Sequence, residues 1–425
     1  MEKYSVAILG CGSRGAKISG LMAALKDQYE VVALCDVNEE QINKTKKLNN
    51  FDNVKTFLDP DEFLTEKYAD IMFIATPDRE HIPQAVKALN LGYDILLEKP
   101  LSDDRDELAL LLETQKRTGR TVVVCHELRY GPGYRKCAEL LESGAIGKLY
   151  AIDASERVSY LHWAQAYVRG IGASIEKGHP AILAKCSHDL DLIQSYAKSE
   201  CDTVSSVGDL SFFIPENAPE DSAYRCLDCK YQDTCVYSAK RIYIDMWYER
   251  GKPEFSWPFN KVTLVNPHTE ESIREGLRNG EYGICAFKCK VEKVDHQFVQ
   301  MTFKNGVKAS LKMVYGAEAG RRITFYGNYG EIIFDERLDN IQVWPYGEKA
   351  QNISIRTLVN EEQSHGGGDA VLVEELYDIL SGKKECPTPL RESIESHLMG
   401  IAADESRKAG GELVKVHRGD KFYEK

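Results

Sequence analysis

The sequence predicts an α/β protein with an N-terminal Rossmann dinucleotide-binding domain and a C-terminal α/β domain whose sheet is open and mainly antiparallel. Strand and helix patterns alternate over residues 1–127, which is typical of a doubly wound parallel sheet. A glycine-rich turn at 10–15 follows the first strand, as in dinucleotide-binding folds. Several strand patterns then follow between 204 and 335, two of them joined by Asn-Gly at 305–306, which is a strong hairpin signal.

Length and charge narrow the class of protein. The chain has 425 residues, enough for about two or three domains. Its formal net charge of -12 argues against nucleic-acid binding. No apolar run is long enough to span a membrane, and the chain enters a strand pattern at once rather than a signal peptide. We therefore expect a cytoplasmic protein that binds neither nucleic acid nor membrane.

The first domain, residues 1–127, is built from short apolar runs that end in turn residues, each followed by a helical pattern. The helix after the glycine turn carries Ile18, Leu21, Met22 and Leu25 on one face. Strands are expected at 5–9, 31–34, 54–57, 70–75, 94–97 and 121–125, and later helices at 39–48, after 59–60, at 81–91 and at 107–117.

The glycine turn and Asp36 predict a site for NAD. In G-x-G-x-x-G, Gly10 allows the sharp turn, Gly12 lets the backbone approach a pyrophosphate, and Gly15 lets helix and strand pack closely. Asp36 ends the second strand, where a carboxylate accepts hydrogen bonds from ribose hydroxyls and repels a 2′-phosphate. This favours NAD, with NADP as the alternative. A Rossmann-like scaffold without a working nucleotide site would carry the same pattern.

The other cofactor residues are expected at the carboxyl ends of the parallel strands, where ligands of such sheets bind. The predicted set is Gly10, Gly12, Ser13, Arg14, Gly15, Asp36, Thr76, Pro77, His81, Glu98, Lys99 and His126.

Two residues are candidates for proton transfer. Lys99 follows the fifth strand, and Pro100 biases it toward an extended backbone beside the nicotinamide. Histidine side chains titrate near neutral pH, and His188 lies on one helix face with Lys185 and Asp191. Asp191 could orient the His188 ring. The alternatives are a solvated lysine and a helix histidine beside a Lys185–Asp189 pair.

The second domain, residues 128–425, contains a long insertion at about 214–290. Its helices are expected at 134–141, from 180, at 369–380 and at 392–408, and its strands at 149–154, 204–213, 294–303, 307–315, 322–326 and 330–335. Residues 158–179 form a loop-rich stretch.

Five of the twelve cysteines form a candidate metal site in and after the insertion. Cys226, Cys229 and Cys235 are followed by Cys285 and Cys289. Four thiolates satisfy tetrahedral zinc, so we expect a structural zinc ion, with one cysteine to spare. Free thiols, an iron–sulfur cluster or a disulfide remain as alternatives.

A glycine-rich segment, 365–369, precedes the penultimate helix. His365 could reach a substrate hydroxyl, and Asp369 could cap the helix; a flexible loop is the alternative. The full set of candidates for binding substrate hydroxyls is Arg129, Tyr130, Tyr167, Arg169, Lys185 and His365.

Together these motifs resemble the Gfo/Idh/MocA oxidoreductases, the glucose–fructose oxidoreductase and inositol dehydrogenase group, in a branch with a cysteine-rich insertion. The matching marks are the glycine turn, Asp36, Ala75-Thr76-Pro77 with His81, Glu98-Lys99-Pro100 and His188-x-x-Asp191. The resemblance implies a site between the domains with Lys99 and His188 as catalytic residues, and a homo-oligomer, dimer or tetramer, built on the open sheet. Ala184 stands where the family has an acid, which leaves the proton relay open.

We therefore expect an NAD-dependent oxidoreductase that moves a hydride between nicotinamide and a secondary alcohol of a sugar, polyol or sugar derivative. Two alternatives are an NAD-dependent glycosidase working by transient oxidation and elimination, and a non-catalytic sugar or nucleotide sensor.

Overall fold

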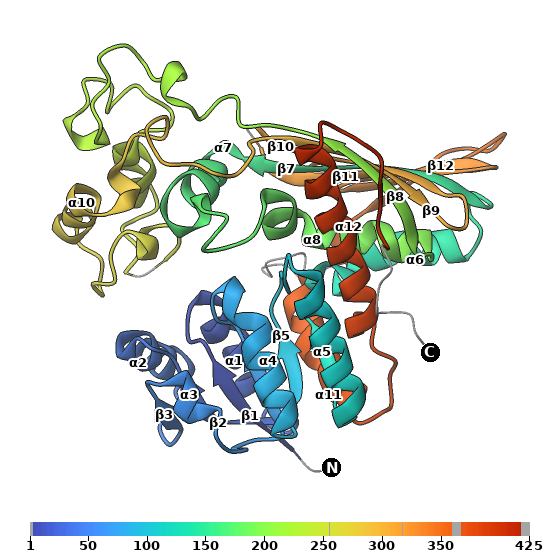
Figure 1. Cartoon of the computed structure of the whole chain (residues 1–425), viewed down its shortest axis with the longest axis horizontal. Coiled ribbons are helices and arrows are strands. Elements are labelled where there is room, and N and C mark those ends of the chain that lie inside the picture. Colours follow the sequence, from blue (N-terminus) through green and yellow to red (C-terminus); the bar gives the residue numbers. More distant parts are fainter. Residues whose placement is uncertain (1–2, 255, 317, 359–366, 418–425) are drawn as a thin grey trace.

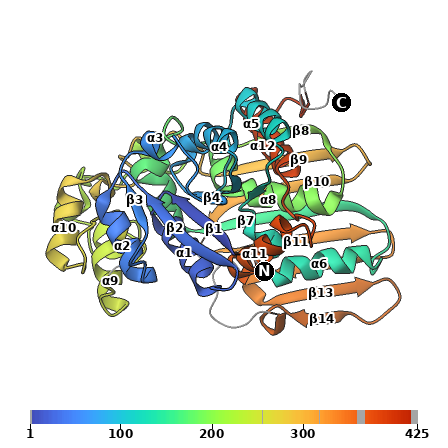
Figure 2. The same ribbon diagram turned by 90° about the horizontal axis from the view of Figure 1, so that it is seen from below.

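The computed structural model describes residues 3–417 except 255, 317 and 359–366. The first domain lies below a large sheet that Figure 1 shows nearly edge-on, and the insertion lies at one end of that sheet. Seen from below in Figure 2, the first domain stands in front of the large sheet, with insertion helices α9 and α10 to one side. Among the described helices, none has the length and apolar character needed to cross a bilayer.

The first sheet is parallel throughout and confirms the predicted Rossmann fold. Its strand order is β3-β2-β1-β4-β5-β6. The strands are β1 Tyr4–Leu9, β2 Tyr29–Cys35, β3 Lys55–Phe57, β4 Ile71–Ile74, β5 Asp94–Leu97 and β6 Val122–Val124. The helices are α1 Ser13–Ala24, α2 Glu39–Asn49, α3 Pro60–Phe63, α4 His81–Asn90 and α5 Arg105–Thr118.

A helix from far along the chain completes this domain. In α11, Gly368–Leu380, residues such as Leu372, Val373 and Leu376 are buried in one apolar cluster with Ile8 of β1. The Tyr29 hydroxyl in β2 donates to the carbonyl oxygen of Val373 at 2.8 Å. The first domain therefore draws part of its core from beyond residue 127.

The second sheet has nine strands in the order β14-β13-β12-β11-β7-β10-β9-β8-β15, and only β7 and β10 pair in parallel. This confirms the predicted open, mainly antiparallel sheet. The strands are β7 Leu149–Ser159, β8 Cys201–Val207, β9 Gln297–Phe303, β10 Lys308–Gly316, β11 Gly320–Gly327, β12 Gly330–Asp335, β13 Asn340–Pro345, β14 Gln351–Ser354 and β15 Val414–Lys415. Helices α6 Pro132–Glu142, α8 Ala181–Ala197 and α12 Leu390–Lys408 cover one face (Figure 1).

Two stretches differ from the expectation. The strand expected at 204–213 spans Cys201–Val207 instead. At Gly208 the backbone comes so close to His296 that a Cβ would lie 2.3 Å from its carbonyl oxygen. The loop-rich stretch contains α7, Tyr160–Trp163, and a π-helical turn, Ala164–Val168. The insertion holds short helices, including α9 Met246–Glu249 and α10 Glu270–Asn279, around a small apolar core of its own.

Candidate active site

The glycine turn has the geometry that a dinucleotide requires. Gly10 has a φ of 97°, and a Cβ there would lie 2.5 Å from the carbonyl oxygen of Ala75. A Cβ at Gly15 would lie 1.9 Å from the carbonyl oxygen of Gly10. A Cβ at Gly12 would meet no protein atom within 4 Å, so the open side of the turn is accessible to a pyrophosphate at the start of α1.

Asp36 is fixed beside this turn. Its carboxylate accepts hydrogen bonds from the backbone N–H of Cys11 at 2.8 Å and from that of Asn38 at 2.9 Å. The side chain is therefore oriented at the carboxyl end of β2, where the ribose of a dinucleotide lies in this fold.

Arg14, in the first turn of α1, is held by carboxylates. Its Nε lies 2.6 Å from Glu98, and its Nη1 lies 2.9 Å from Asp369. Burial alone would lower the pKa of Arg14, but the charges of Glu98, Glu127 and Asp369 raise it well above its usual value. Helix α11 begins at Gly368, so Asp369 lies in the first turn of α11. Its carboxylate pairs with Arg14 and Lys17 and does not cap the helix.

His81 connects two strand-end loops. Its two ring nitrogens lie 2.7 Å from the carbonyl oxygen of Pro100 and 3.0 Å from that of Thr76. The Thr76 hydroxyl donates to Gln84 at 2.7 Å. The turn after β4, which includes Pro77, is thus tied to the turn that carries Lys99.

The charge of Lys99 affects the pKa values of two histidines. Among the described residues its ammonium forms no ion pair. Burial and the charges of Lys185 and Lys99 together lower the pKa of His162 to about 4, although Glu156 raises it in part. Burial and the charges of Arg129 and Lys99 also hold the pKa of His126 well below its usual value. Lys99 therefore lies within electrostatic range of His162, a residue of the second domain.

His188, on α8, pairs with a carboxylate that sequence reasoning missed. Its Nε2 lies 3.5 Å from Oε1 of Glu127, which is 1% exposed, and its ring centroid lies 5.7 Å from that of His126. Asp191 instead lies 3.4 Å from Arg129 and 3.9 Å from His126. Glu127 thus places a carboxylate beside His188 although position 184 is Ala. Its place directly after the strand-end residue His126 was the available signal.

The second domain forms the other wall of the candidate site, and this second wall contains a buried network of two cations and two carboxylates. The Nζ of Lys185 lies 2.8 Å from Glu156 of β7. The Nε of Arg321 in β11 lies 2.9 Å from both Glu156 and Asp189. The alternative pairing of Lys185 with Asp189 is therefore wrong. Burial would lower the pKa of Lys185, but Glu156 raises it, so Lys185 is a charged donor.

The insertion reaches both sides of the site. The Trp257 ring lies edge-on to His162, with centroids 5.4 Å apart, and His162 stacks on Tyr167 at 6.0 Å. The Asn260 amide lies 3.5 Å from the hydroxyl of Ser13 in the glycine turn. Trp257 and Asn260 were not predicted, since nothing in the sequence places the insertion beside the cofactor domain.

Comparisons with known proteins give the family. The model of the Gfo/Idh/MocA oxidoreductases' NAD-binding Rossmann fold matches residues 4–126, and that of their C-terminal alpha/beta domain matches residues 258–416. The chain belongs to the Gfo/Idh/MocA family. Two observations agree: both domains match in the family's order, and the described fold has both its sheets.

The chain is similar to the following three proteins, among others. YteT of Bacillus subtilis (strain 168), named as an oxidoreductase, is 24% identical over 89% of this chain and 91% of its own length. D-glucoside 3-dehydrogenase of Escherichia coli (strain K12) is 23% identical over 35% of this chain and 42% of its own. The structure of levoglucosan dehydrogenase with NADH and levoglucosan has a TM-score of 0.71 at 16% identity, covering 98% of this chain and all of that one (100%).

Three predicted hydroxyl-binding residues of this Gfo/Idh/MocA chain make protein contacts here. Arg129 lies 2.6 Å from Glu392, and the Tyr130 hydroxyl lies 3.1 Å from that of Thr388. Arg169 points into the insertion, where its Nη2 lies 3.6 Å from Sγ of Cys226. His365 lies outside the described residues.

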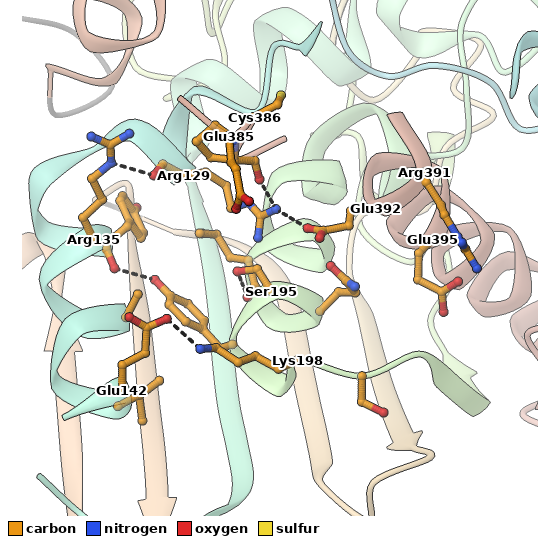
Figure 3. A pocket seen from close by; sticks show the side chains of 18 of the residues that line it. Arg129, Arg135, Glu142, Ser195, Lys198, Glu385, Cys386, Arg391, Glu392 and Glu395 are labelled. Atoms are coloured by element: carbon orange, nitrogen blue, oxygen red, sulfur yellow. Dashed lines mark hydrogen bonds and ion pairs between the residues drawn. The ribbon is translucent and has the colours of Figure 1, made fainter. Parts of the chain in front are cut away.

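A cavity of about 880 Å³ lies between α6, α8 and residues 384–395 (Figure 3). Arg129 and Glu392 form an ion pair at its wall, and Lys198 and Glu142 form another at 2.6 Å. Neither Lys99 nor His188 lines this cavity.

Asp191 predicts a pH dependence of stability. Burial raises its pKa to about 6, although Arg129 lowers it in part. Because this folded-state pKa exceeds the unfolded value, the contribution to stability is complete below about pH 4 and is lost as the pH rises through about 6. In urea unfolding at pH 5 and pH 8, we expect Asp191→Asn to gain about 1.4 kcal/mol relative to the unchanged protein over this interval. Exposed Asp52→Asn is the control, and parallel pH curves for Asp191→Asn would contradict the assignment.

Proposed function

We propose that this oxidoreductase transfers a hydride between a secondary alcohol carbon of a sugar, polyol or sugar derivative and NAD. One arrangement carries the proposal: the Lys99 ammonium of the cofactor domain lies within electrostatic range of His162 of the second domain, and His188 of the second domain pairs with Glu127. The names of the sugar-directed relatives support the substrate class, since one acts on D-glucosides and another was solved with levoglucosan.

The residues divide the chemistry among themselves. When bound, NAD supplies the hydride acceptor, and the glycine turn and Asp36 would hold it. Lys99 or His188 takes the proton of the substrate hydroxyl as the alcohol becomes a ketone. Glu127 orients the His188 ring and stabilises its protonated form, and Lys185 donates a hydrogen bond to a second hydroxyl.

The cofactor preference gives a prediction at Asp36. Replacing Asp36 by Ala removes hydrogen bonds from the ribose hydroxyls, so we expect the Kd for NAD to rise about 10- to 100-fold. Binding of NADP should weaken less, because the charge that repels its 2′-phosphate is gone. Titration of each cofactor into Asp36→Ala measures both effects. Asp27→Ala, in the exposed turn before β2, is the control. Equal losses for the two cofactors would overturn the role of Asp36.

The reaction itself is tested with a panel of sugars, inositols and aryl glycosides. NADH and released aglycone are measured separately with the same enzyme and NAD. We expect NADH to accumulate in proportion to oxidised substrate. Release of aglycone without NADH would instead identify the glycosidase alternative, and NAD or sugar binding without turnover would identify the sensor.

We also propose that the chain works in the cytoplasm as a homo-oligomer and that its insertion holds a structural zinc ion. Phe298 of β9 and Trp344 of β13 are exposed and alternate with buried side chains along their strands, so they lie on the sheet face that points away from the core. Apolar side chains on an open sheet face favour contact with a second copy. Light scattering of the purified chain measures whether it is a dimer or a tetramer.

A further inference from the structure

Four of the five candidate cysteines surround one small cavity in the insertion. Its lining includes Cys226, Cys229, Cys235 and Cys285, together with apolar residues such as Phe287. Cys289 is not part of this lining. All of these cysteines are free thiols in the structure. The cavity therefore selects four ligand candidates from the five that spacing alone could not separate.

Arg169 provides a second, independent observation. Its side chain is 1% exposed, and it donates to the carbonyl oxygens of Ile284 at 2.9 Å and Tyr237 at 2.7 Å. Its Nη2 lies 3.6 Å from Sγ of Cys226, and its Nη1 has no hydrogen-bond partner. Within residues 3–417, apart from the gaps, no carboxylate pairs with Arg169.

A guanidinium is always charged, and a buried charge without a counter-charge is strongly destabilising. The groups around Arg169 that can hold negative charge are the thiols of Cys226, Cys285 and Cys289 and the phenol of Tyr243. Burial raises the pKa of the Tyr243 phenol and keeps it neutral, which leaves the thiols. Neutral thiols would leave the cation uncompensated. Thiolates bound to a divalent metal ion would keep a net negative charge beside it.

We propose that Cys226, Cys229, Cys235 and Cys285 bind one zinc ion as four thiolates, and that Arg169 is the counter-charge of this centre. The donor set is closed, since four protein sulfur atoms leave no open position, so the ion is structural rather than catalytic. This inference specifies the zinc site included in the proposed function, but it does not depend on the enzyme's reaction.

Binding requires the thiols to move inward. Zinc–sulfur bonds of about 2.3 Å place ligand sulfur atoms about 3.8 Å apart. Among the described residues, three ligand atoms within 4.8 Å of one another occur at Asp209, Asp295 and His296 rather than at the cysteines. That group has another explanation, because an oxygen of Asp295 already accepts backbone N–H groups at 2.7–3.4 Å. The cysteine site is thus expected to close around its ion.

The centre would brace one wall of the active site. Arg169 directly follows the segment 160–168, which carries His162 and Tyr167. Its hydrogen bonds to Ile284 and Tyr237 tie the end of this segment to the cysteine loops. Loss of the metal should therefore loosen the wall on which Trp257 and His162 meet.

The experiment uses the full chain purified in reducing buffer without a metal-binding tag. Elemental analysis is expected to find about one zinc per chain, and cobalt-substituted protein is expected to show the absorption bands of a tetrahedral thiolate site. Protein without zinc after reconstitution, or protein that holds iron instead, would overturn the proposal.

The ligand set is read from the unchanged protein by thiol alkylation and mass spectrometry, with and without a chelator. We expect zinc to protect Cys226, Cys229, Cys235 and Cys285 but not Cys289. Protection of Cys289 in place of Cys285 would overturn the assignment.

Variants then separate the roles. Cys285→Ser should lose the ion and Cys289→Ser, the matched control, should retain it. Arg169→Met should retain zinc but release it to a colorimetric chelator about tenfold faster, and Arg169→Lys should restore slow release. Equal release rates for all three forms would exclude the counter-charge role. None of these readouts depends on turnover, so they succeed or fail separately from the proposed reaction.

Discussion

Replacing Lys99 by Met is expected to lower the rate of hydride transfer about 10³-fold, the effect of losing a positioned acid or base. Met keeps the length of the side chain, and the described part of the chain offers the Lys99 ammonium no ion pair whose loss would unfold the protein. The Kd for NAD should change little, because the glycine turn and Asp36 bind the distant half of the dinucleotide. Single-turnover formation of NADH, with NAD binding measured in parallel, tests this.

The control for Lys99→Met is Lys116→Met, on the exposed side of α5. It removes the same charge from the same domain at a distance from the strand ends. Turnover by Lys99→Met close to that of this control would show that Lys99 does not transfer the proton and would leave His188 as the acid or base.

Replacing Arg321 by Leu should destabilise the fold by about 3–5 kcal/mol, because it leaves two buried carboxylates without their shared cation. Arg321 lies 2.9 Å from both Glu156 and Asp189, and all three are buried. Urea unfolding at pH 8 measures the loss. Lys185 would remain as the partner of Glu156, so its ammonium should also be less available to a substrate hydroxyl.

The destabilisation by Arg321→Leu should be smaller at pH 5. Burial raises the pKa of Asp189 to about 6 even with Arg321 present. Without the cation the pKa of Asp189 rises further. Below this pKa the carboxyl is neutral and costs little to bury, whereas above this pKa it is charged. Arg322→Leu, at the next and exposed position of β11, is the control. A loss that is equal at both pH values would mean that packing rather than charge dominates.

The positions in the fold of the predicted cofactor residues could be anticipated from the sequence, because they depend on local order. A strand, a glycine turn, a helix and a strand ending in Asp36 occupy consecutive residues, and parallel strands bring their carboxyl ends to one edge. The positions of Gly10, Asp36 and Lys99 follow from this rule alone. Glu127 follows the same rule, since it lies one residue after His126 at a strand end, although it was not among the predicted residues.

The second wall was less predictable, since it depends on which strands lie side by side. Glu156 and Arg321 meet because β7 pairs with β11, which are far apart in sequence. Register between such strands has no local signal. The position of Trp257 beside His162 likewise depends on how a long insertion folds back. Arg129 and Arg169 were predicted by residue type, and residue type does not distinguish a ligand-binding arginine from one that pairs within the protein.

The position of helix α11 has a consequence for how the chain folds during its synthesis. The ribosome releases residues 1–127 long before Gly368–Leu380, yet Leu372, Val373 and Leu376 cover apolar side chains of the first sheet. Until they emerge, that face of the nascent Rossmann domain is exposed to water and to other chains. Final closure of the cofactor domain is therefore expected only after Gly368–Leu380 has been synthesised. A fragment cut at residue 127 should aggregate unless a peptide of the α11 sequence is supplied.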